Sequence, residues 1–381
     1  MGHTIQDRQT RRFLAPLSRQ LRRWVDRATA MVGGGRCYLG DLRVPAPSGG
    51  AVEHPQRLAL FPSGGQDVAS ARLRSLPFLS LMEERSVRSI RDTARLLRDP
   101  PDIAWIQKRL TAGHLRVARL VKESGGVVIY DCDDSGPDLD YWAPPALVEE
   151  MLLLADVVTT DTPERGERLR EIVPSFQVRV LENQMDYADQ LVHEDPPLAS
   201  GGGDGLRVLW FGGGENLDSL EAYGAVLGSV EGVRLVLCGP SASDARRVFG
   251  RLPAEIRRWS PEGFIEILRS CDVTLMSHFG SRHHTAKSAH KMVTSICHGV
   301  PALVSATPDY RRIAALAGVM EDAAFASPED LRERLERMKS EEVRRAYIAR
   351  SRPELLARHG PGTFPAAAAS LLRQLAAGSA S

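Results

Sequence analysis

The chain has almost no excess charge of either sign, and it has few cysteines and few lysines. Its 381 residues include 49 basic and 48 acidic side chains, which argues against a general binder of nucleic acid or other polyanions. Only five of the basic residues are lysines, and arginine dominance of this kind carries no function by itself. The five cysteines are odd in number and lack the spacing of a zinc site, so we expect buried free thiols in a reducing compartment.

Long apolar runs are absent as well. No stretch approaches the ~20 apolar residues of a membrane-spanning helix, and we recognise no signal peptide at the start of the sequence. We therefore expect a cytoplasmic protein, or one that lies on the inner face of a membrane. Apolar residues make up 43% of the chain and charged residues 25%, which is typical of a globular protein, and the length suits two domains.

Residues 1–50 are expected to form an amphipathic helix and a linker. Apolar residues recur at helical spacing between Phe13 and Ala28 with arginines around them, and residues 33–50 are rich in glycine and proline. Such a helix could contact a membrane surface through residues 5–30, or it could pack on its own protein with a solvated arginine face. The sequence leaves both alternatives open.

Short apolar runs alternate with helical stretches over most of the chain. We expect strands at 57–61, 103–106, 127–130, 157–160, 178–181, 206–211, 233–238, 272–277 and 302–305. We expect helices at 86–97, 145–154, 216–227, 242–248, 263–269, 288–297, 310–316 and 364–375. Because a segment rich in proline and glycine interrupts this rhythm at 187–205, the pattern predicts two Rossmann-like α/β domains, residues 51–190 and 205–355, facing a ligand-binding cleft. Residues 356–381 would hold the last helix and a flexible tail.

The stretch from Ser277 to Gly299 is the strongest candidate for a functional site. Lys287 and Lys291 lie four residues apart, on one face of a helix expected to begin near Ser288. Like charges at this spacing destabilise a helix by about 0.2–0.5 kcal/mol. They also face the positive end of the helix dipole. A bound anion would resolve this conflict, and the alternative is that both lysines point into solvent.

Four histidines in the first part of this stretch, His278, His283, His284 and His290, raise the question of a metal site. Adjacent histidines rarely bind one ion, and no carboxylate or cysteine stands at metal-ligand spacing. We therefore expect no bound metal.

Glycine-rich turns follow the first expected strand of each domain. Gly64 and Gly65 follow the strand at 57–61, and Gly212, Gly213 and Gly214 follow the strand at 206–211. Glycine lets a backbone approach a phosphate or a sugar closely, although many such turns use it for steric reasons alone. Glycine-rich turns in both halves are better evidence for such a binding role than a turn in one half alone.

Carboxylates follow the strand at 127–130. Asp131, Asp133 and Asp134 could accept a proton from a hydroxyl, bind a metal or cap the next turn, and the sequence leaves these roles open. Lys108 ends the preceding strand, so it could meet Asp131 at the same edge of the sheet.

The segment from Lys287 to Ser305 resembles the donor-binding signature of GT-B glycosyltransferases, in particular the group 1, family 4-like branch. The Gly299-Val300-Pro301 turn, the glycine turn at 212–214 and Cys238-Gly239-Pro240 suit this pattern. The resemblance covers most of residues 205–350, and over 55–190 it is architectural. It implies that the helix at 364–375 is a crossover helix that returns to the first domain.

This resemblance implies transfer of a sugar from a nucleoside-diphosphate donor to a hydroxyl acceptor, with retention and without a metal or other cofactor. The donor would be bound by Gly64, Gly65, Gly212, Gly213, Gly214, Gly239, Lys287, Ser288, Lys291 and Thr294. Asp131 or Asp134 would position the acceptor, which could be a glycan, a lipid-linked glycan, a protein or a small molecule; nucleic acid is not an expected partner.

Two departures from the family pattern keep other interpretations open. Thr294 and Ala286 stand where the family usually has glutamates, the first of which holds the donor ribose. A non-catalytic nucleotide-sugar-binding or scaffolding protein is the main alternative. A GT-A enzyme that uses Asp131-Cys132-Asp133 as a metal-binding motif, and a GT-B epimerase or phosphorylase, are further ones.

Overall fold

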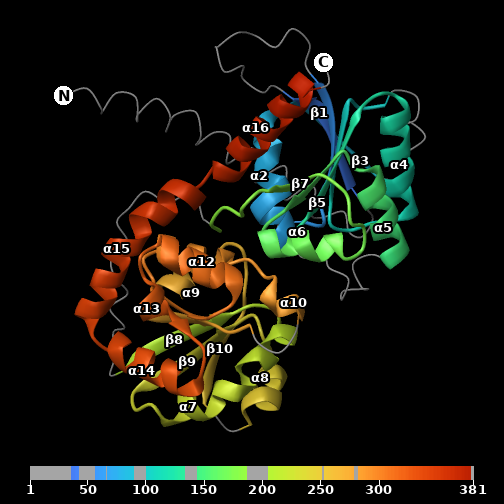
Figure 1. The fold of residues 1–381 in the computed structure, drawn as a ribbon. Coiled ribbons are helices and arrows are strands. Elements are labelled where there is room, and N and C mark those ends of the chain that lie inside the picture. The colour runs from blue at the N-terminus through green and yellow to red at the C-terminus, as the bar shows by residue number, and fades with distance from the viewer. Residues whose placement is uncertain are drawn as a thin grey trace, which may run out of the picture. The chain divides into compact units, whose positions relative to one another are not determined.

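The computed structural model describes residues 36–42, 56–65, 67–89, 100–133, 144–186, 205–250, 253–278 and 282–378. The chain divides into two compact units, one made of residues up to Glu182 and from Gly362 onward, the other of Asn183–Pro361 (Figure 1). The amphipathic helix predicted at the N-terminus and its contact with a membrane lie outside the described residues. None of the described helices is long and apolar enough to span a membrane.

The first unit is built on a seven-stranded sheet with the order β3-β1-β2-β4-β5-β6-β7. Its strands are β1 (Arg36–Leu42), β2 (Gln56–Phe61), β3 (Met82–Ser89), β4 (Ile103–Gln107), β5 (Val127–Cys132), β6 (Val157–Thr160) and β7 (Val178–Val180). The strands from β2 to β7 in this order are parallel, as predicted. β1 pairs antiparallel with both β2 and β3, which extends the sheet at that edge.

Two segments of this sheet differ from the sequence prediction. Residues 36–42, expected in a linker, form β1, because Cys37 and Tyr38 are buried on opposite faces of the sheet. Residues 86–89, expected at the start of a helix, belong to β3 and pair with β1. Pairing with a neighbouring strand overrides a short helical pattern that is ambiguous by itself.

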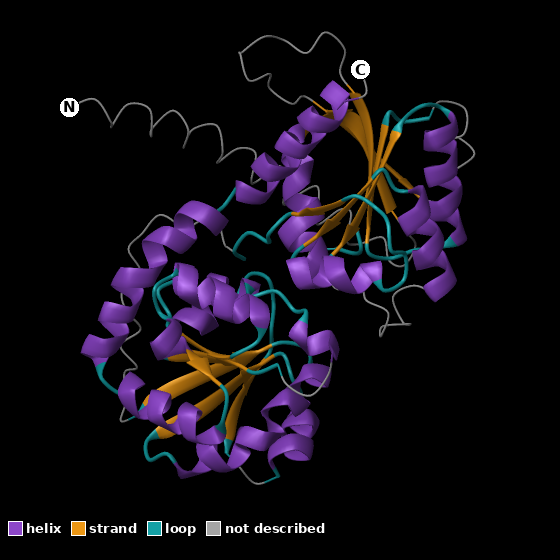
Figure 2. Ribbon diagram, in the orientation of Figure 1, coloured by secondary structure: helices purple, strands orange, loops and turns teal. Residues whose placement is uncertain are grey.

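Helices cover both faces of the first sheet (Figures 1 and 2). They are η1 (Ala71–Ser75), α2 (Leu76–Phe78), η2 (Leu79–Leu81), α4 (Ala112–Glu123), α5 (Pro145–Leu154), α6 (Pro163–Arg170) and α16 (Thr363–Gly378). Strand β4 is buried throughout: Trp105 belongs to the same core cluster as residues of α2 and α16, whereas Ile106 belongs to the cluster that contains residues of α4, α5 and α6 on the other face. Helix α16 belongs to this unit, as expected for the crossover helix.

The second unit contains a six-stranded parallel sheet with the order β10-β9-β8-β11-β12-β13. Its strands are β8 (Leu206–Phe211), β9 (Val233–Cys238), β10 (Ala254–Arg257), β11 (Val273–Met276), β12 (Ala302–Ser305) and β13 (Ala324–Phe325). Along the chain these are strands 1 to 6 of the unit, so the order is 3-2-1-4-5-6, that of a Rossmann fold. The direction of winding reverses between β8 and β11.

The helices of the second unit follow the predicted alternation, and they lie on both sides of the sheet (Figure 2). They are η4 (Gly214–Tyr223), α7 (Gly224–Ser229), α8 (Ala242–Phe249), α9 (Phe264–Arg269), α10 (Arg282–Thr285), α11 (His290–Cys297), α12 (Pro308–Leu316), α13 (Met320–Ala323), α14 (Pro328–Met338) and α15 (Glu341–His359). The stretch after β8 is a 3-10 helix before it becomes α-helical.

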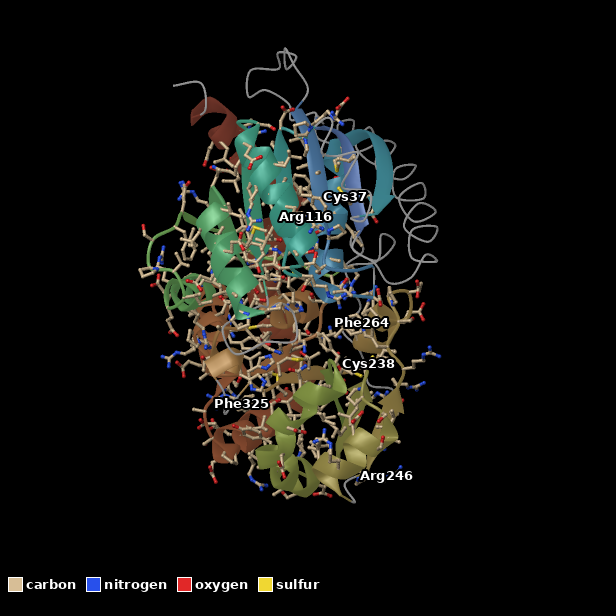
Figure 3. All side chains as sticks on the ribbon, turned by 90° about the vertical axis from the view of Figure 1, so that its right-hand side faces the viewer. Cys37, Arg116, Cys238, Arg246, Phe264 and Phe325 are labelled. Atoms are coloured by element: carbon tan, nitrogen blue, oxygen red, sulfur yellow. The ribbon has the colours of Figure 1, made fainter. Side chains whose placement is uncertain are left out.

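All five cysteines are buried and have free thiols, as predicted from the sequence. Figure 3 labels Cys37 in the first unit and Cys238 in the second among interior side chains, whereas Arg246 lies at the periphery. Burial raises the pKa of Cys238 to about 11 and that of Cys297 to about 12. Both thiols are therefore protonated and unreactive at neutral pH.

The C-terminal helix is held to the first unit by Phe364. Its ring is 1% exposed, lies 6.5 Å from the ring of Trp105 and stacks under the guanidinium of Arg74 at 4.6 Å. We expect Phe364→Ala to lower the free energy of unfolding by about 3–5 kcal/mol, because it removes a buried aromatic side chain. Urea denaturation followed by circular dichroism measures this loss. Leu375→Ala, near the end of the same helix where burial is partial, should cost less than half as much, and equal losses would contradict this account.

Candidate functional site

The two segments that the sequence singles out meet at the switch point of the second sheet. The turn Gly212–Gly214 follows β8, and the stretch with the two lysines follows β11, which is the neighbour of β8. In open α/β sheets, ligands bind outside the carboxyl ends of the strands where the winding reverses. The fold therefore places both segments where this class of sheet binds its ligands.

Both lysine side chains reach the turn after β8. Nζ of Lys287 donates a hydrogen bond to Oδ1 of Asn216 at 2.8 Å, and Nζ of Lys291 donates to the carbonyl oxygen of Phe211 at 2.9 Å. The ammonium group of Lys291 also lies 5.5 Å from the ring centroids of both Trp210 and Phe211, within cation–π range. The lysines are thus half-buried and held at the turn, whereas the alternative interpretation had them pointing into solvent.

Helix α11 begins two residues later than the sequence suggests. Ala289 is the N-cap, so Lys287 precedes the helix and Lys291 is its second residue. The N–H of Ala289 donates to Oδ2 of Asp309 at 2.6 Å, and Oδ1 of the same carboxylate accepts a bond from Arg312 at 2.7 Å. Asp309 therefore offsets part of the positive field at the start of the helix. Sequence reasoning missed this role, because Asp309 and Ala289 are brought together only by the tertiary fold.

Absent side chains create the space at this turn. A Cβ atom at Gly212 would lie 2.8 Å from Nζ of Lys291 and 3.1 Å from the ring of Trp210. Gly239, after β9, has φ +113°, and a Cβ there would lie 2.3 Å from the carbonyl oxygen of Gly212. At Gly214 it would lie 2.6 Å from Oδ2 of Asp244. The turns after β8 and β9 can therefore pack this closely only with glycine at these positions.

Two other predicted donor-binding residues contact the segment at the start of the second unit. Oγ of Ser288 accepts a hydrogen bond from Nδ2 of Asn183 at 3.1 Å. Oγ1 of Thr294, which is 1% exposed, accepts one from the backbone N–H of Asp186 at 2.9 Å. These hydroxyls hold residues 183–186 against α11 and the loop before it. The contact gives Thr294 a structural role, and Ala286 is equally buried.

His278, which follows β11, is a further member of the site that sequence reasoning considered only as a metal ligand. It is 4% exposed, its backbone N–H donates to Oγ of Ser305 at 2.9 Å, and its ring stacks on that of Tyr310. Burial and the nearby ammonium groups of Lys291 and Lys287 lower the pKa of the imidazole well below its usual value. His278 is therefore neutral at pH 7. Within the described ranges, no three His, Cys, Asp or Glu side chains could together hold a metal ion.

The glycine turn of the first unit is shaped by a buried glutamine. Oε1 of Gln107 accepts a hydrogen bond from the N–H of Ser63 at 3.0 Å, and its Nε2 donates to the carbonyl oxygen of Ser70 at 2.8 Å. A Cβ atom at Gly64 would lie 2.4 Å from Cγ2 of Val68. The carbonyl oxygen of Gly65 accepts a hydrogen bond from the N–H of Val68 at 3.0 Å. Steric need within the turn therefore accounts for Gly64.

Asp131 is part of a buried ion pair. It is fully buried, and its Oδ1 lies 2.5 Å from Nη2 of Arg74 while its Oδ2 accepts a bond from Nε at 2.9 Å. Thr159 donates a third bond to Oδ1 at 2.7 Å. Both oxygens are therefore engaged inside the protein, which speaks against the expected contact with an acceptor hydroxyl. Asp134, the other predicted catalytic residue, lies outside the described residues.

Lys108 meets Asp131 through a backbone hydrogen bond. Its N–H donates to the carbonyl oxygen of Asp131 at 2.8 Å, while its Nζ lies 3.2 Å from Oγ of Ser70. A second buried pair, Arg165 and Asp161 at 3.1 Å, stands at the end of the next strand. Burial raises the pKa of Asp161 to about 7, although Arg165 opposes the shift. The carboxyl edge of the first sheet thus carries buried charges that are paired within the unit.

The pair of Arg74 and Asp131 makes a prediction about stability. We expect Asp131→Asn to lower the free energy of unfolding by about 3–5 kcal/mol, because it leaves the buried guanidinium of Arg74 without a counter-charge. The double variant Arg74→Met, Asp131→Leu should recover most of this loss, since an apolar pair avoids the cost of desolvating two ions. Chemical denaturation of both variants checks this, and a single variant as stable as the wild-type protein would contradict the structural role.

No protein-family model and no curated protein sequence matches this chain. Solved structures do. Sucrose-phosphate synthase from Thermosynechococcus elongatus matches with a TM-score of 0.54 and 14% identity, over 75% of this chain and 77% of that one. HepE from Anabaena in complex with UDP matches with a TM-score of 0.56 and 10% identity, over 74% and 81%. A glycosyltransferase from Rickettsia africae matches with a TM-score of 0.55 and 8% identity, over 75% and 80%.

At identities this low, the likeness is one of fold. It spans about three quarters of the chain, and the matched structures are GT-B glycosyltransferases. The two Rossmann-like units, with the C-terminal helix in the first, are what the sequence resemblance implies. The chain therefore has the GT-B glycosyltransferase fold.

Proposed function

We propose that this protein transfers a sugar from a nucleoside-diphosphate donor to a hydroxyl acceptor. One observation carries the proposal: the ammonium groups of Lys287 and Lys291 both reach the glycine turn at the switch point of the second sheet. Two cations and the start of a helix at one sheet edge are suited to a polyanion, and a nucleoside diphosphate is one.

The same groups would serve the chemical step. A nucleoside diphosphate leaves the sugar with increasing negative charge, so fixed cations near the phosphates stabilise the transition state more than the bound donor. In the structure, both ammonium groups donate to neutral oxygens, the side-chain carbonyl of Asn216 and the backbone carbonyl of Phe211. Exchange of these for phosphate oxygens would replace neutral acceptors by anionic ones, so that each hydrogen bond also becomes an ion pair. Transfer without a metal ion, and with retention, is part of this proposal.

The solved relatives favour a particular class of donor. HepE from Anabaena has been solved in complexes with UDP and with UDP-glucose. We therefore take a uridine diphosphate sugar as the first donor to test. The acceptor would be a glycan, a lipid-linked glycan, a protein or a small molecule, and a cytoplasmic location stays a prediction.

A non-catalytic nucleotide-sugar-binding protein is the second candidate function. It is favoured by the lack of a carboxylate at Ala286 and Thr294, since both positions are buried and the hydroxyl of Thr294 is bonded to the backbone of Asp186. Release of UDP from UDP-glucose, measured with and without candidate acceptors, separates the two functions. Tight binding without turnover would favour the second.

The donor site makes a prediction about binding. We expect Lys287→Ala combined with Lys291→Ala to weaken UDP binding by at least about 100-fold, because each lost charge-assisted hydrogen bond is worth roughly 1.5–3 kcal/mol. Isothermal titration calorimetry with UDP, and with inorganic pyrophosphate as a probe that has no base, measures the loss.

The matched control is Lys339→Ala. Lys339 lies in the same unit, where it pairs on the surface with Glu336 at 2.6 Å, so its loss should leave UDP affinity unchanged. Thermal melting shows whether each variant is folded. A folded double variant that binds UDP and pyrophosphate as tightly as the wild-type protein would refute the donor-site assignment.

A further inference from the structure

His278 combines three features that are rarely found together. Its ring is nine-tenths or more buried, and Nδ1 has no hydrogen-bond partner among the described residues. It follows β11, beside the switch point, and the ammonium groups of Lys287 and Lys291 are close enough to act on its charge. A buried polar atom without a partner is costly and is rare in folded proteins. Such an atom next to two cations points to a ligand that binds there.

The neighbours of His278 are almost all positive or neutral. The ring of Tyr310, from α12, stacks on it at 5.5 Å, and the ring of His284, from α10, lies at 5.6 Å. Oγ of Ser305, at the end of β12, accepts its backbone N–H. The remaining titratable groups that act on its charge come from α11 and the loop before it: Lys291, Lys287 and His290. Asp309, the residue before Tyr310, is bonded to Arg312 and to the start of α11.

These surroundings keep the imidazole neutral. Burial is the largest cause that lowers its pKa, followed by the charges of Lys291 and Lys287. A diphosphate bound to the two lysines would bring at least as much negative charge as the lysines bring positive charge. The field at the imidazole would then change sign and favour its protonated form.

We propose that His278 takes up a proton from solvent when a nucleoside diphosphate binds at Lys287 and Lys291, and thereby becomes the third cation of the site. This inference rests on the proposed function. Nδ1 gains a proton and donates a charge-assisted hydrogen bond to a phosphate oxygen, so that this buried atom gains a hydrogen-bond partner. Because binding consumes a proton, the contribution of His278 to affinity is large at low pH and is lost as the pH rises through the pKa of His278 in the complex.

Proton uptake is measured by calorimetry of UDP binding in buffers that differ in ionisation enthalpy. The phosphates of UDP also exchange protons, so the decisive quantity is the difference between the wild-type protein and His278→Gln. We expect the substitution to remove up to one proton of uptake. It should weaken binding about tenfold near pH 6 and less near pH 8, because one unit of pKa corresponds to a factor of ten.

His298→Gln is the matched control. His298 is also buried, but it lies after the far end of α11, where Nε2 bonds to the carbonyl oxygen of Asp186 at 2.8 Å. Its substitution should leave proton uptake unchanged. In case His278→Gln fails to fold, NMR of the histidine ring protons in the wild-type protein gives the pKa of His278 with and without inorganic pyrophosphate, and we expect the ligand to raise it.

The outcomes separate this inference from the proposed function. If UDP or pyrophosphate binds through the two lysines but the pKa of His278 and the proton uptake do not change, the role of His278 is refuted and the donor site remains. An equal loss of uptake in His298→Gln would also refute it. If neither probe binds to the wild-type protein, the donor site is refuted, and the role of His278 with it.

Discussion

The ammonium group of Lys291 reaches the carbonyl oxygen of Phe211 because the next residue, Gly212, has no side chain. A Cβ atom there would lie 2.8 Å from the nitrogen. A Cβ atom at Gly239 would likewise lie too close to the carbonyl oxygen of Gly212. The turns after β8 and β9 and the start of α11 can therefore pack this closely because glycine leaves room between them. Everything proposed for the second unit depends on this close approach, since it brings Lys291 to Phe211, which lies 80 residues earlier in the sequence.

Electrostatics decides what this arrangement can bind. Two ammonium groups stand near the start of a helix, where the dipole already favours an anion. Two carboxylates among the described side chains lie near these turns: Asp309 is shared with Arg312, and Asp244 is bonded to Ser241. Two cations at one turn favour a ligand with several negative charges over one with a single charge. The neutral His278 adds a group that can respond to such a ligand.

Much of the fold is visible in the sequence, because buried parallel strands are short apolar runs. The predicted bounds of β6, β8, β9 and β12 agree with the structure at both ends. The strands that the sequence did not predict are short, lie at an edge of a sheet or pair with an edge strand. The edge strand β10 (Ala254–Arg257) is half-exposed, and its charged residues interrupt any apolar pattern. β1 was hidden by the glycines and prolines around it, and β3 by a short helical spacing.

The candidate site was predictable in part, for a related reason. Two lysines four residues apart near the start of an expected helix form a local pattern, so the sequence shows them, although Lys287 precedes α11 in the structure. Their partners are not visible in the sequence: Asn216 lies 71 residues from Lys287, and Asp309 lies 20 residues from Ala289, whose N–H its carboxylate accepts. The same limit applies to Asp131, whose partner Arg74 lies 57 residues away. Only the fold distinguishes a carboxylate that is engaged in an ion pair from one that is available to bind a substrate.

That distinction applies to both sheets. At the carboxyl edge of the first, Asp131 and Asp161 are buried against arginines of the same unit, so their charges are already compensated. At the carboxyl edge of the second, Lys287 and Lys291 donate to neutral oxygens at the switch point. Compensated charges stabilise a fold, whereas cations that donate to neutral acceptors gain most when an anion arrives. By this argument the second sheet is the one suited to the proposed anion binding, and the paired charges of the first stabilise its fold.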